Sequence, residues 1–406
     1  TAAEIRNNEF AHLGSAYGNN RQDGDGISIQ SPATVVGNLF HDMQGAYDAS
    51  GGSYLEVLGL TTASNNTFKG AQRSAVRLLT NSVNSIISKN IITGSITGSG
   101  VEAIANNVSV ASGTITQNSI YANHTLGIDL GSNGVTLNDA NDSDTGVNNL
   151  LNFPLFKEVL NVNGQLVIKG CAPAGAKLEL YEADVSATSA SGVTVGSNKL
   201  NKTQDYGEGE RYLISLVEGV GEDTVTTPVD CATLTDSDAN SAVGMSPFQW
   251  ILTMPTEFVV GDKLTATATV RGPAPPEFSP LSALHLYQDR GDALASYGDP
   301  THTITDGLYL GMQLPDRDDT ALYSAGADGD GADEDGVSTL ATLTTVTQTY
   351  STNVMLTNQL GKEAWLVGWI DFNRNGTFDS NEAASIAVSA GNQHKTLGLT
   401  WSNLNG

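Results

Sequence analysis

Basic residues are scarce in this 406-residue chain. Lysine and arginine together number 19, aspartate and glutamate number 44, and the formal net charge is −25 at pH 7. Nucleic acids and anionic lipids bind proteins through a cationic face. The charge therefore argues against nucleic acid and anionic membrane as partners, and it suits a protein that works among divalent cations.

Long apolar runs and cysteines are scarce too. No run of about 18 apolar residues occurs, so we expect no membrane-inserted segment. No signal peptide is visible and the chain begins at Thr1, which we interpret as a mature product or an excerpt of a longer chain. The two cysteines, Cys171 and Cys231, cannot form a metal cluster. They form either one disulfide in an oxidising compartment or two buried free thiols.

A short motif recurs along the first third of the chain: an asparagine followed two residues later by phenylalanine or isoleucine. Each motif is followed by a short segment that alternates apolar with polar or small residues, as in Ile27–Ile29 and Val76–Leu78. A period of this length indicates stacked supersecondary units. Two short strands per coil predict a parallel β-helix of about five coils over residues 1–150. The anchoring asparagines are Asn8, Asn38, Asn66, Asn90 and Asn118.

The asparagines have a physical role in such a coil. In stacked coils each turn residue lies above its equivalent, so the amides can donate to and accept from one another and also pair with buried backbone groups. The alternative is that asparagine stands there only because it tolerates the left-handed backbone conformation. The fixed phase between asparagine and the inward apolar residue favours the ladder of amides.

The outward positions of the second strand carry charged residues on successive coils. β-Helix enzymes that cleave polysaccharides need clustered carboxylates or a basic residue on such a strip. The alternative is a charge stripe on the surface, which we favour; we therefore expect no enzyme. The positions are Ser28, Glu56, Arg77, Glu102 and Asp129.

A polar loop follows the last predicted coil. Asp139, Asn141, Asp142 and Asp144 supply oxygen ligands of the kind that calcium prefers, and they can converge if the loop curls. A solvated polar linker is the alternative. We predict a calcium site here.

The pattern then changes to separate alternating strands with Pro and Gly between them. Residues 151–287 predict an Ig-like antiparallel β-sandwich. Residues 288–406 predict a second sandwich, so the fold class is all-β.

The last predicted domain contains a more specific motif. The stretch from Asp371 to Glu382 fits the twelve-residue calcium loop, with Gly376 at the sharp turn. A predicted strand precedes the loop where an EF-hand has a helix, so we expect a calcium loop on a β-scaffold rather than a bare polar turn. The predicted ligands are Asp371, Asn373, Asn375, the carbonyl of Thr377, Asp379 and Glu382.

An acidic run lies earlier in the same domain. Its carboxylates repel one another unless cations lie between them, so the run is either a calcium site or a disordered acidic loop. The candidate ligands are Asp328, Asp330, Asp333 and Asp335.

Three stretches resemble parts of large bacterial surface proteins. Residues 1–156 resemble the right-handed parallel β-helix repeats of adhesin-like exoproteins, through the segments 127–131 and 148–154. Residues 170–282 resemble the module that follows those repeats, through 173–181 and 261–269. Residues 289–390 resemble a GEVED domain, through 289–293, 307–311, 334–337 and 369–373. The resemblance implies an extracellular, secreted or cell-surface protein and carries over no enzyme.

We therefore expect a calcium-stabilised, non-enzymatic structural or adhesive segment of a bacterial surface protein or fibre. Its partner would be a cell-surface or matrix carbohydrate or protein. The first coil begins at Ile5 with no capping helix, so we expect upstream coils or another copy, stacked head to tail, to cover it. The alternatives are a carbohydrate-active β-helix enzyme with accessory domains and a self-assembling filament subunit.

Overall fold

The computed structural model divides the chain into two compact units, Thr1–Leu284 and His285–Gly406, and each is described by itself. The described residues are 2–12, 25–43, 52–104, 113–183, 206, 208–221, 223–224, 229–236, 241–259, 261–270, 278–279, 282–305, 307–318, 322–324, 326, 329, 336–337, 340–344 and 346–404. None of the described helices is long and apolar enough to cross a membrane.

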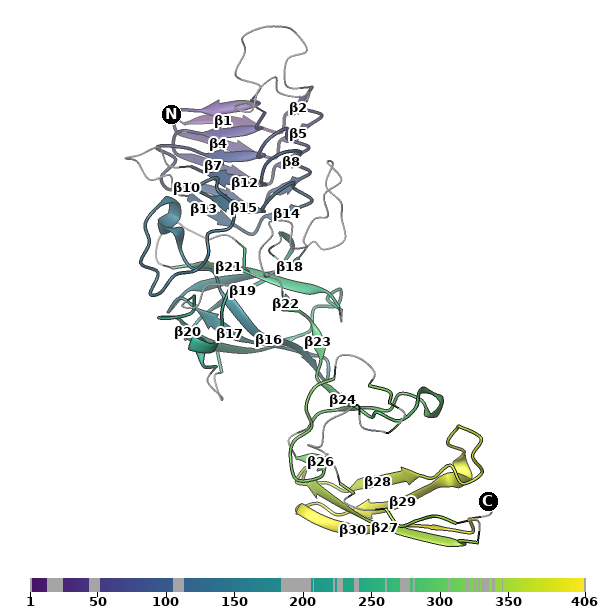
Figure 1. Cartoon of the computed structure of the whole chain (residues 1–406). Helices are drawn as coiled ribbons and strands as arrows, with labels where there is room; N and C mark the ends of the chain where they lie inside the picture. The colour runs from purple at the N-terminus through teal and green to yellow at the C-terminus, as the bar shows by residue number, and fades with distance from the viewer. Residues whose placement is uncertain are drawn as a thin grey trace. The chain divides into compact units, whose positions relative to one another are not determined.

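The first unit begins with a parallel β-solenoid of about four turns (Figure 1). Three five-stranded sheets run along it, and each turn leads from one strand of a sheet to the next, so that four turns separate the first strand from the fifth. The first sheet contains β1 (Ala3–Arg6), β4 (Ala33–Val36), β7 (Thr61–Ser64), β10 (Ser85–Ser88) and β13 (Gly113–Thr116). The second contains β2 (Glu9–Ala11), β5 (Leu39–His41), β8 (Thr67–Lys69), β11 (Ile91–Thr93) and β14 (Ser119–Tyr121). The third contains β3 (Ile27–Ile29), β6 (Leu55–Val57), β9 (Val76–Leu78), β12 (Val101–Ala103) and β15 (Ile128–Leu130).

The parallel solenoid predicted from the sequence is confirmed, but the prediction of two strands per coil is wrong. The strands of the first sheet were missed, because small or polar residues interrupt the apolar pattern at several of their inward positions. In β7, for example, the inward residues are Thr61 and Ala63, both fully buried. Such residues give little hydrophobic alternation, although their backbones pair in parallel register like the others.

The asparagine ladder is confirmed. The Oδ1 atom of Asn66 accepts hydrogen bonds from the backbone N and the Nδ2 of Asn38, at 2.9 and 3.0 Å. The same pair of bonds joins Asn38 to Asn8, Asn90 to Asn66 and Asn118 to Asn90. The left-handed conformation belongs instead to the residue before each asparagine, namely Asn7, Gly37, Asn65, Lys89 and Gln117, with φ between 54° and 67°.

The solenoid core is built from stacked equivalent residues. The rings of Phe10, Phe40 and Phe68 stack on successive coils, with centroids 4.6 and 4.8 Å apart. Ile92 and Ile120 continue the same column on the next two coils, in register with Phe68. All but Phe10 are fully or almost fully buried.

The last coil is covered by residues of the antiparallel part of the unit. Tyr181 and Phe278 lie in the same buried cluster as the solenoid core. Two buried carboxylates accept hydrogen bonds from the last coil: Glu179 from the backbone N of Gln117, and Glu208 from the backbone N and Nδ2 of Asn123. The β-solenoid therefore ends against a protein surface that satisfies its polar groups.

Antiparallel strands form the remainder of the first unit. In one sheet β17 (Gln165–Ala172) lies between β16 (Leu155–Val162) and β20 (Ser246–Thr253). In the other the order is β19 (Gly209–Val217), β18 (Lys177–Ala183), β21 (Lys263–Thr269) and β22 (Ser282–Ala283). Trp250 and Leu180, one from each sheet, lie in one shared buried core.

Two further features mark this part of the unit. Cys171 and Cys231 form a disulfide, so the first of the two sequence alternatives is confirmed. The short 3-10 helices are η1 (Val147–Leu150) and η2 (Cys231–Thr233).

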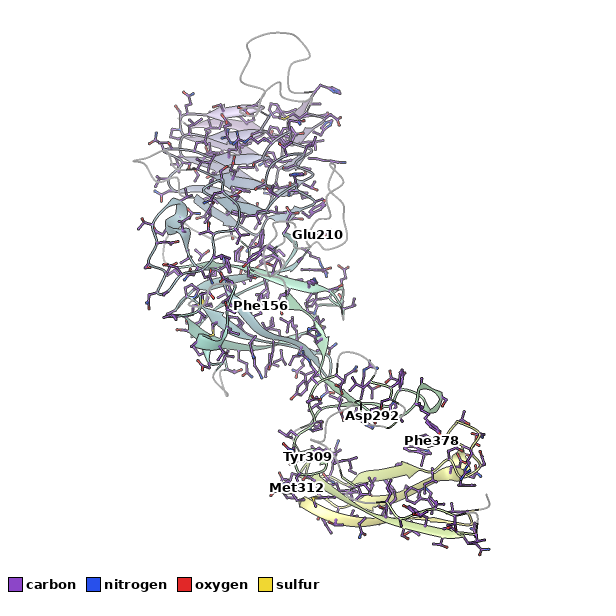
Figure 2. All side chains as sticks on the ribbon, viewed as in Figure 1. Phe156, Glu210, Asp292, Tyr309, Met312 and Phe378 are labelled. Carbon is purple, nitrogen blue, oxygen red and sulfur yellow. A yellow bond between two sulfur atoms is a disulfide. The ribbon has the colours of Figure 1, made fainter. Side chains whose placement is uncertain are left out.

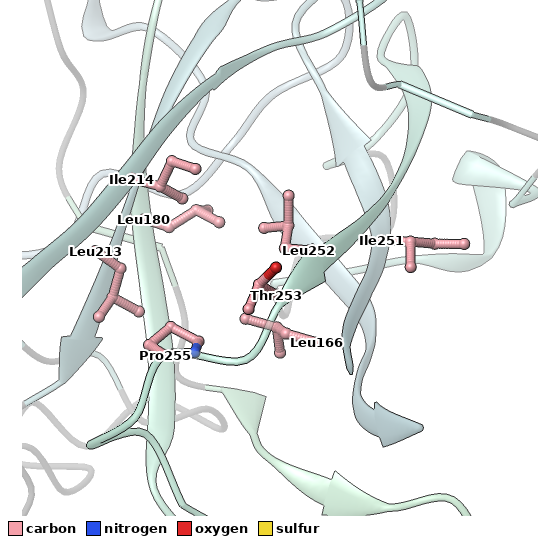
Figure 3. Close-up of a pocket in the computed structure, with 8 residues that line it drawn as sticks. All are labelled: Leu166, Leu180, Leu213, Ile214, Ile251, Leu252, Thr253 and Pro255. Carbon is pink, nitrogen blue, oxygen red and sulfur yellow. The ribbon is translucent and has the colours of Figure 1, made fainter. Parts of the chain in front are cut away.

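A cavity of about 370 Å³ opens between the two sheets. Its lining residues are Leu166, Leu180, Leu213, Ile214, Ile251, Leu252, Thr253 and Pro255 (Figure 3).

The second unit is also built from antiparallel strands. β26 (Leu308–Leu310), β27 (Thr349–Asn358) and β30 (Asn392–Ser402) form one sheet, and β28 (Ala364–Trp369) pairs with β29 (Ala383–Val388). β24 (Gln288–Arg290) and β25 (Thr301–Thr303) form a separate hairpin; β23 (His285–Leu286), η3 (Ala295–Tyr297) and η4 (Ser380–Glu382) complete the unit. Leu366, Leu399 and Trp401 lie in its core. The all-β fold class is confirmed.

Candidate metal centres

The loop that links the solenoid to the antiparallel sheets is tied by its own side-chain amides. The Oδ1 of Asn138 accepts from the backbone N of Phe153, and its Nδ2 donates to the Phe153 carbonyl. Asn152 forms the equivalent pair of bonds with the backbone of Asp139. Because both amides bridge the two ends of the loop, the residues between them curl into a closed turn.

Three carboxylates meet inside this turn. One oxygen from each of Asp139, Asp142 and Asp144 lies within 4.8 Å of the other two, and no other such group of acidic, histidine or cysteine side chains occurs in the described part of the chain. Asp139 accepts from the backbone N of Ser143, and Asp142 accepts from the backbone N of Asn152. The buried Oδ1 of Asp144 has no hydrogen-bond partner.

The electrostatics of the turn favour a cation. Burial, together with the nearby charges of Asp139 and Asp142, raises the pKa of Asp144 to about 6. Burial likewise raises the pKa of Asp142. Carboxylate oxygens in a group without a basic partner suit a hard cation such as Ca²⁺. The donor set therefore fits calcium.

Asn141, predicted to be a fourth ligand, also makes contacts outside the turn. Its Oδ1 packs against Gly244, where an added Cβ would come within 2.6 Å of it. Its backbone N donates to the carbonyl of Val243. Asn141 and Asp142 both adopt the left-handed conformation, with φ of 60° and 52°. Asn141 thus joins the turn to a neighbouring segment, and Asp142 is the residue directed at the other carboxylates.

The predicted calcium loop from Asp371 to Glu382 follows β28. Asp371 accepts from the backbone N of Asn375 and of Gly376, at 3.1 and 2.9 Å. Gly376 has a φ of 83°, which fits the sharp turn required at this position. Asn373 and Asn375 both direct Nδ2 at the Oδ2 of Asp379, so the side chains at positions 3, 5 and 9 lie together.

Glu382 closes this loop. It is fully buried in η4, where Oε2 accepts from the backbone N of Asp379 at 2.9 Å. The predicted carbonyl ligand, from Thr377, lies between Asn375 and Asp379 in the chain, and the backbone N of Thr377 donates to Asn375. The loop therefore carries three carboxylate groups and two amides, although its three carboxylates do not converge within 4.8 Å of one another as those of the first loop do. The residues fit a Ca²⁺ ion in kind and order.

Aromatic contacts join the second loop to its surroundings. The hydroxyl of Tyr297 donates to Asp371 at 2.9 Å. The rings of Tyr297 and Phe378 stack with their centroids 4.4 Å apart, and the rings of Phe378 and Trp369 stack with their centroids 6.1 Å apart. Burial alone would raise the pKa of Asp371. Hydrogen bonds from the backbone N of Gly376 and from the hydroxyl of Tyr297 outweigh this effect and hold that pKa below its usual value.

The third candidate calcium site lies outside the described residues. It comprises Asp328, Asp330, Asp333 and Asp335.

The charged row on the third solenoid sheet has the predicted register. Glu56, Arg77, Glu102 and Asp129 are partners on successive strands. The row is largely buried rather than a surface stripe: Arg77 donates to Glu56 at 2.6 Å and to Glu102 at 2.9 Å. Burial raises the pKa of Asp129 to about 6, and the charge of Glu102 adds to the effect.

Comparison with known proteins identifies no family. No protein-family model matches the chain, and no curated protein matches it either. What can be stated is the coarser description: a β-solenoid of about four turns followed by antiparallel β-sheets.

Proposed function

We propose that this chain is a calcium-stabilised, non-enzymatic structural and adhesive segment of an extracellular bacterial surface protein or fibre. The observation that carries the proposal is the group formed by Asp139, Asp142 and Asp144. Three carboxylates this close repel one another at neutral pH, and a divalent cation bound between them offsets that repulsion. Calcium would thereby stabilise the folded loop.

The position of the loop gives the cation a mechanical role. The loop follows β15, the last solenoid strand, and leads into β16. Around it, Tyr181 and Phe278 complete the solenoid core, so the two parts of the unit share one apolar interior. Calcium in the linker would resist opening of this junction, which is a useful property for a segment that carries load.

Other observations support an extracellular setting. The disulfide between Cys171 and Cys231 fits an oxidising compartment. Calcium modules outside cells work with dissociation constants of roughly 10⁻⁴–10⁻³ M, which are attainable with few ligands. The net charge of −25 is offset where divalent cations are plentiful.

Calorimetry tests the calcium part of the proposal. Thermal unfolding of the full chain is recorded with calcium and with chelator, for the wild type and for Asp142→Asn, Glu382→Ala and Glu9→Gln. We expect chelator to lower the melting temperature of the wild type. Asp142→Asn and Glu382→Ala should reduce that shift, because each removes ligand oxygens.

The control removes one negative charge away from both loops. Glu9 is exposed, with 67% of its side chain accessible, so Glu9→Gln should retain the full calcium shift. An unchanged wild-type melting temperature under chelator would rule out calcium stabilisation.

A carbohydrate-active enzyme is the second candidate. It is favoured by Glu102 and Asp129, which are paired on adjacent strands, with the pKa of Asp129 raised to about 6 as in a general acid. The ion pair between Glu102 and Arg77, and the burial of both carboxyl groups, weigh against it. Polysaccharide cleavage that is lost in Glu102→Ala and Asp129→Ala would establish the enzyme.

A further inference from the structure

The outward face of β28 exposes large apolar side chains. Trp365, Val367 and Trp369 alternate with the buried Leu366 and are 65%, 40% and 46% exposed. Soluble proteins seldom leave several large apolar side chains together in water unless the patch has a ligand. The alternation means that these three side chains form one continuous surface.

A cavity of about 520 Å³ lies over this face. It is also lined by the hairpin residues Thr301–Thr303 and by β26 (Leu308–Leu310). The labels β24, β26 and β28 in Figure 1 mark these segments. Tyr309, which Figure 2 labels, belongs to the β26 wall. The volume lies within the range of roughly 300–1,000 Å³ that small-molecule sites occupy.

The charges in the lining limit the ligand. Among the described residues that line the cavity, Asp289 is the one carboxylate and none is lysine or arginine. A phosphate, sulfate or uronate group would therefore meet no fixed cation, and it would meet the negative charge of the whole chain. The ligand expected here is neutral.

The cavity lining combines two kinds of chemistry. It includes the indole rings of Trp365 and Trp369, and also Thr301, His302 and Thr303, all exposed, which offer hydroxyl and imidazole groups. A pyranose ring has the matching pair of surfaces: its C–H face packs on an aromatic ring, and its hydroxyls form hydrogen bonds. A lipid tail would leave the polar side unpaired.

The spacing of the two tryptophans indicates the size of the ligand. Four residues along a strand span about 13 Å. This exceeds the width of one sugar ring, so rings stacked on both tryptophans belong to an oligosaccharide.

We propose that this cavity binds a neutral oligosaccharide, with Trp365 and Trp369 stacking on sugar rings and the threonine hydroxyls of β25 hydrogen-bonding to it. The inference rests on the proposed adhesive function and names the ligand class of that function. In this account the second unit supplies the recognition, and the acidic loops of both units supply calcium stabilisation.

Titration calorimetry and tryptophan fluorescence of the full chain, in calcium buffer, test the inference. The probes are neutral oligosaccharides of glucose, mannose, galactose and N-acetylglucosamine, each long enough to span both tryptophans, with oligogalacturonate as the anionic comparison. We expect at least one neutral probe to bind and oligogalacturonate not to bind. Trp365→Ala should weaken affinity about tenfold, and Trp365→Phe should recover part of it because an aromatic face is restored.

Val346→Ala is the matched control, since Val346 is 84% exposed and does not line the cavity. Its affinity should equal that of the wild type. Folding of every variant is checked by its melting temperature. The inference is overturned if folded wild-type protein binds none of the neutral probes, if the anionic probe binds as well as they do, or if Trp365→Ala binds unchanged. These results are independent of the chelator experiment, so the glycan site can fail while calcium stabilisation stands, and the reverse.

Discussion

At the scale of single residues, each solenoid turn divides two roles between neighbouring residues: the asparagine forms the ladder, and the residue before it adopts the left-handed conformation. The ladder asparagines were predictable because each keeps a fixed phase with an inward phenylalanine or isoleucine. The left-handed residues beside them were not, since Lys89 and Gln117 carry no signal for that conformation. Their geometry is imposed by the stacked neighbours, which outweigh a local preference of about 1–2 kcal/mol.

The ladder predicts a large effect at its centre. Asn90→Ala would leave the backbone N and the Nδ2 of Asn66 without their acceptor, and the Ala63 carbonyl without a donor. Because a buried unsatisfied group costs roughly 1–3 kcal/mol, we expect the free energy of unfolding to fall by about 3 kcal/mol or more. Denaturant titration measures it. Asn8→Ala, at the exposed end of the ladder, is the control and should lower the free energy of unfolding much less. An equal decrease in both variants would contradict the account.

At Ala122, by contrast, a substitution is expected to stabilise the fold. Ala122 has a φ of 55°, and the equivalent positions of two earlier coils hold Gly70 and Gly94. Ala122→Gly should therefore raise the free energy of unfolding by about 0.5–1 kcal/mol, because glycine removes the strain of a left-handed Cβ. Ala103→Gly, in a buried strand, should lower it. Destabilisation at Ala122 would show that its methyl group contributes more by packing than it costs by strain.

At the scale of elements, periodicity predicted the register but not the surroundings. The outward residues of the third sheet stack as the spacing required, since a fixed coil length places equivalent positions side by side. Their burial was not predictable, because it depends on loops such as the one holding Ser132, which donates to Glu102. The first sheet was missed for a related reason: its inward positions mix small or polar residues, such as Thr61 and Ser85, with large apolar ones. The exposed tryptophans of β28 alternate clearly in sequence, yet which face lies outward is decided by the partner sheet.

The buried row predicts a pH dependence. The pKa of Asp129 is about 6 in the folded chain against a reference of 3.8, so the folded state binds more protons than the unfolded state between those values. The contribution of Asp129 to the free energy of unfolding should therefore fall as pH rises from 4 to 6, by about 3 kcal/mol at most. Urea titrations across this range, compared with Asp129→Asn, isolate the effect. The same slope in both proteins would contradict the assignment.

At the scale of the whole molecule, each unit combines a β-core with an acidic loop whose donors suit calcium. The two loops were predictable from residue type and spacing: Asp139, Asp142 and Asp144 do converge, and the chain from Asp371 does turn at Gly376. The contact between Asn141 and Gly244 was not predictable, because the two residues lie far apart in the sequence. A sequence pattern gives the local curl of a loop, whereas contacts with distant segments depend on the tertiary fold.

Anomalous X-ray diffraction from crystals grown with calcium tests the central claim most directly, since it locates the ion itself. The account predicts an anomalous peak bound by oxygens of Asp139, Asp142 and Asp144, and a second peak inside the loop from Asp371 to Glu382, each at roughly 2.3–2.6 Å from its ligands. Crystals in excess calcium that show no peak in either loop would contradict the claim that calcium stabilises this chain.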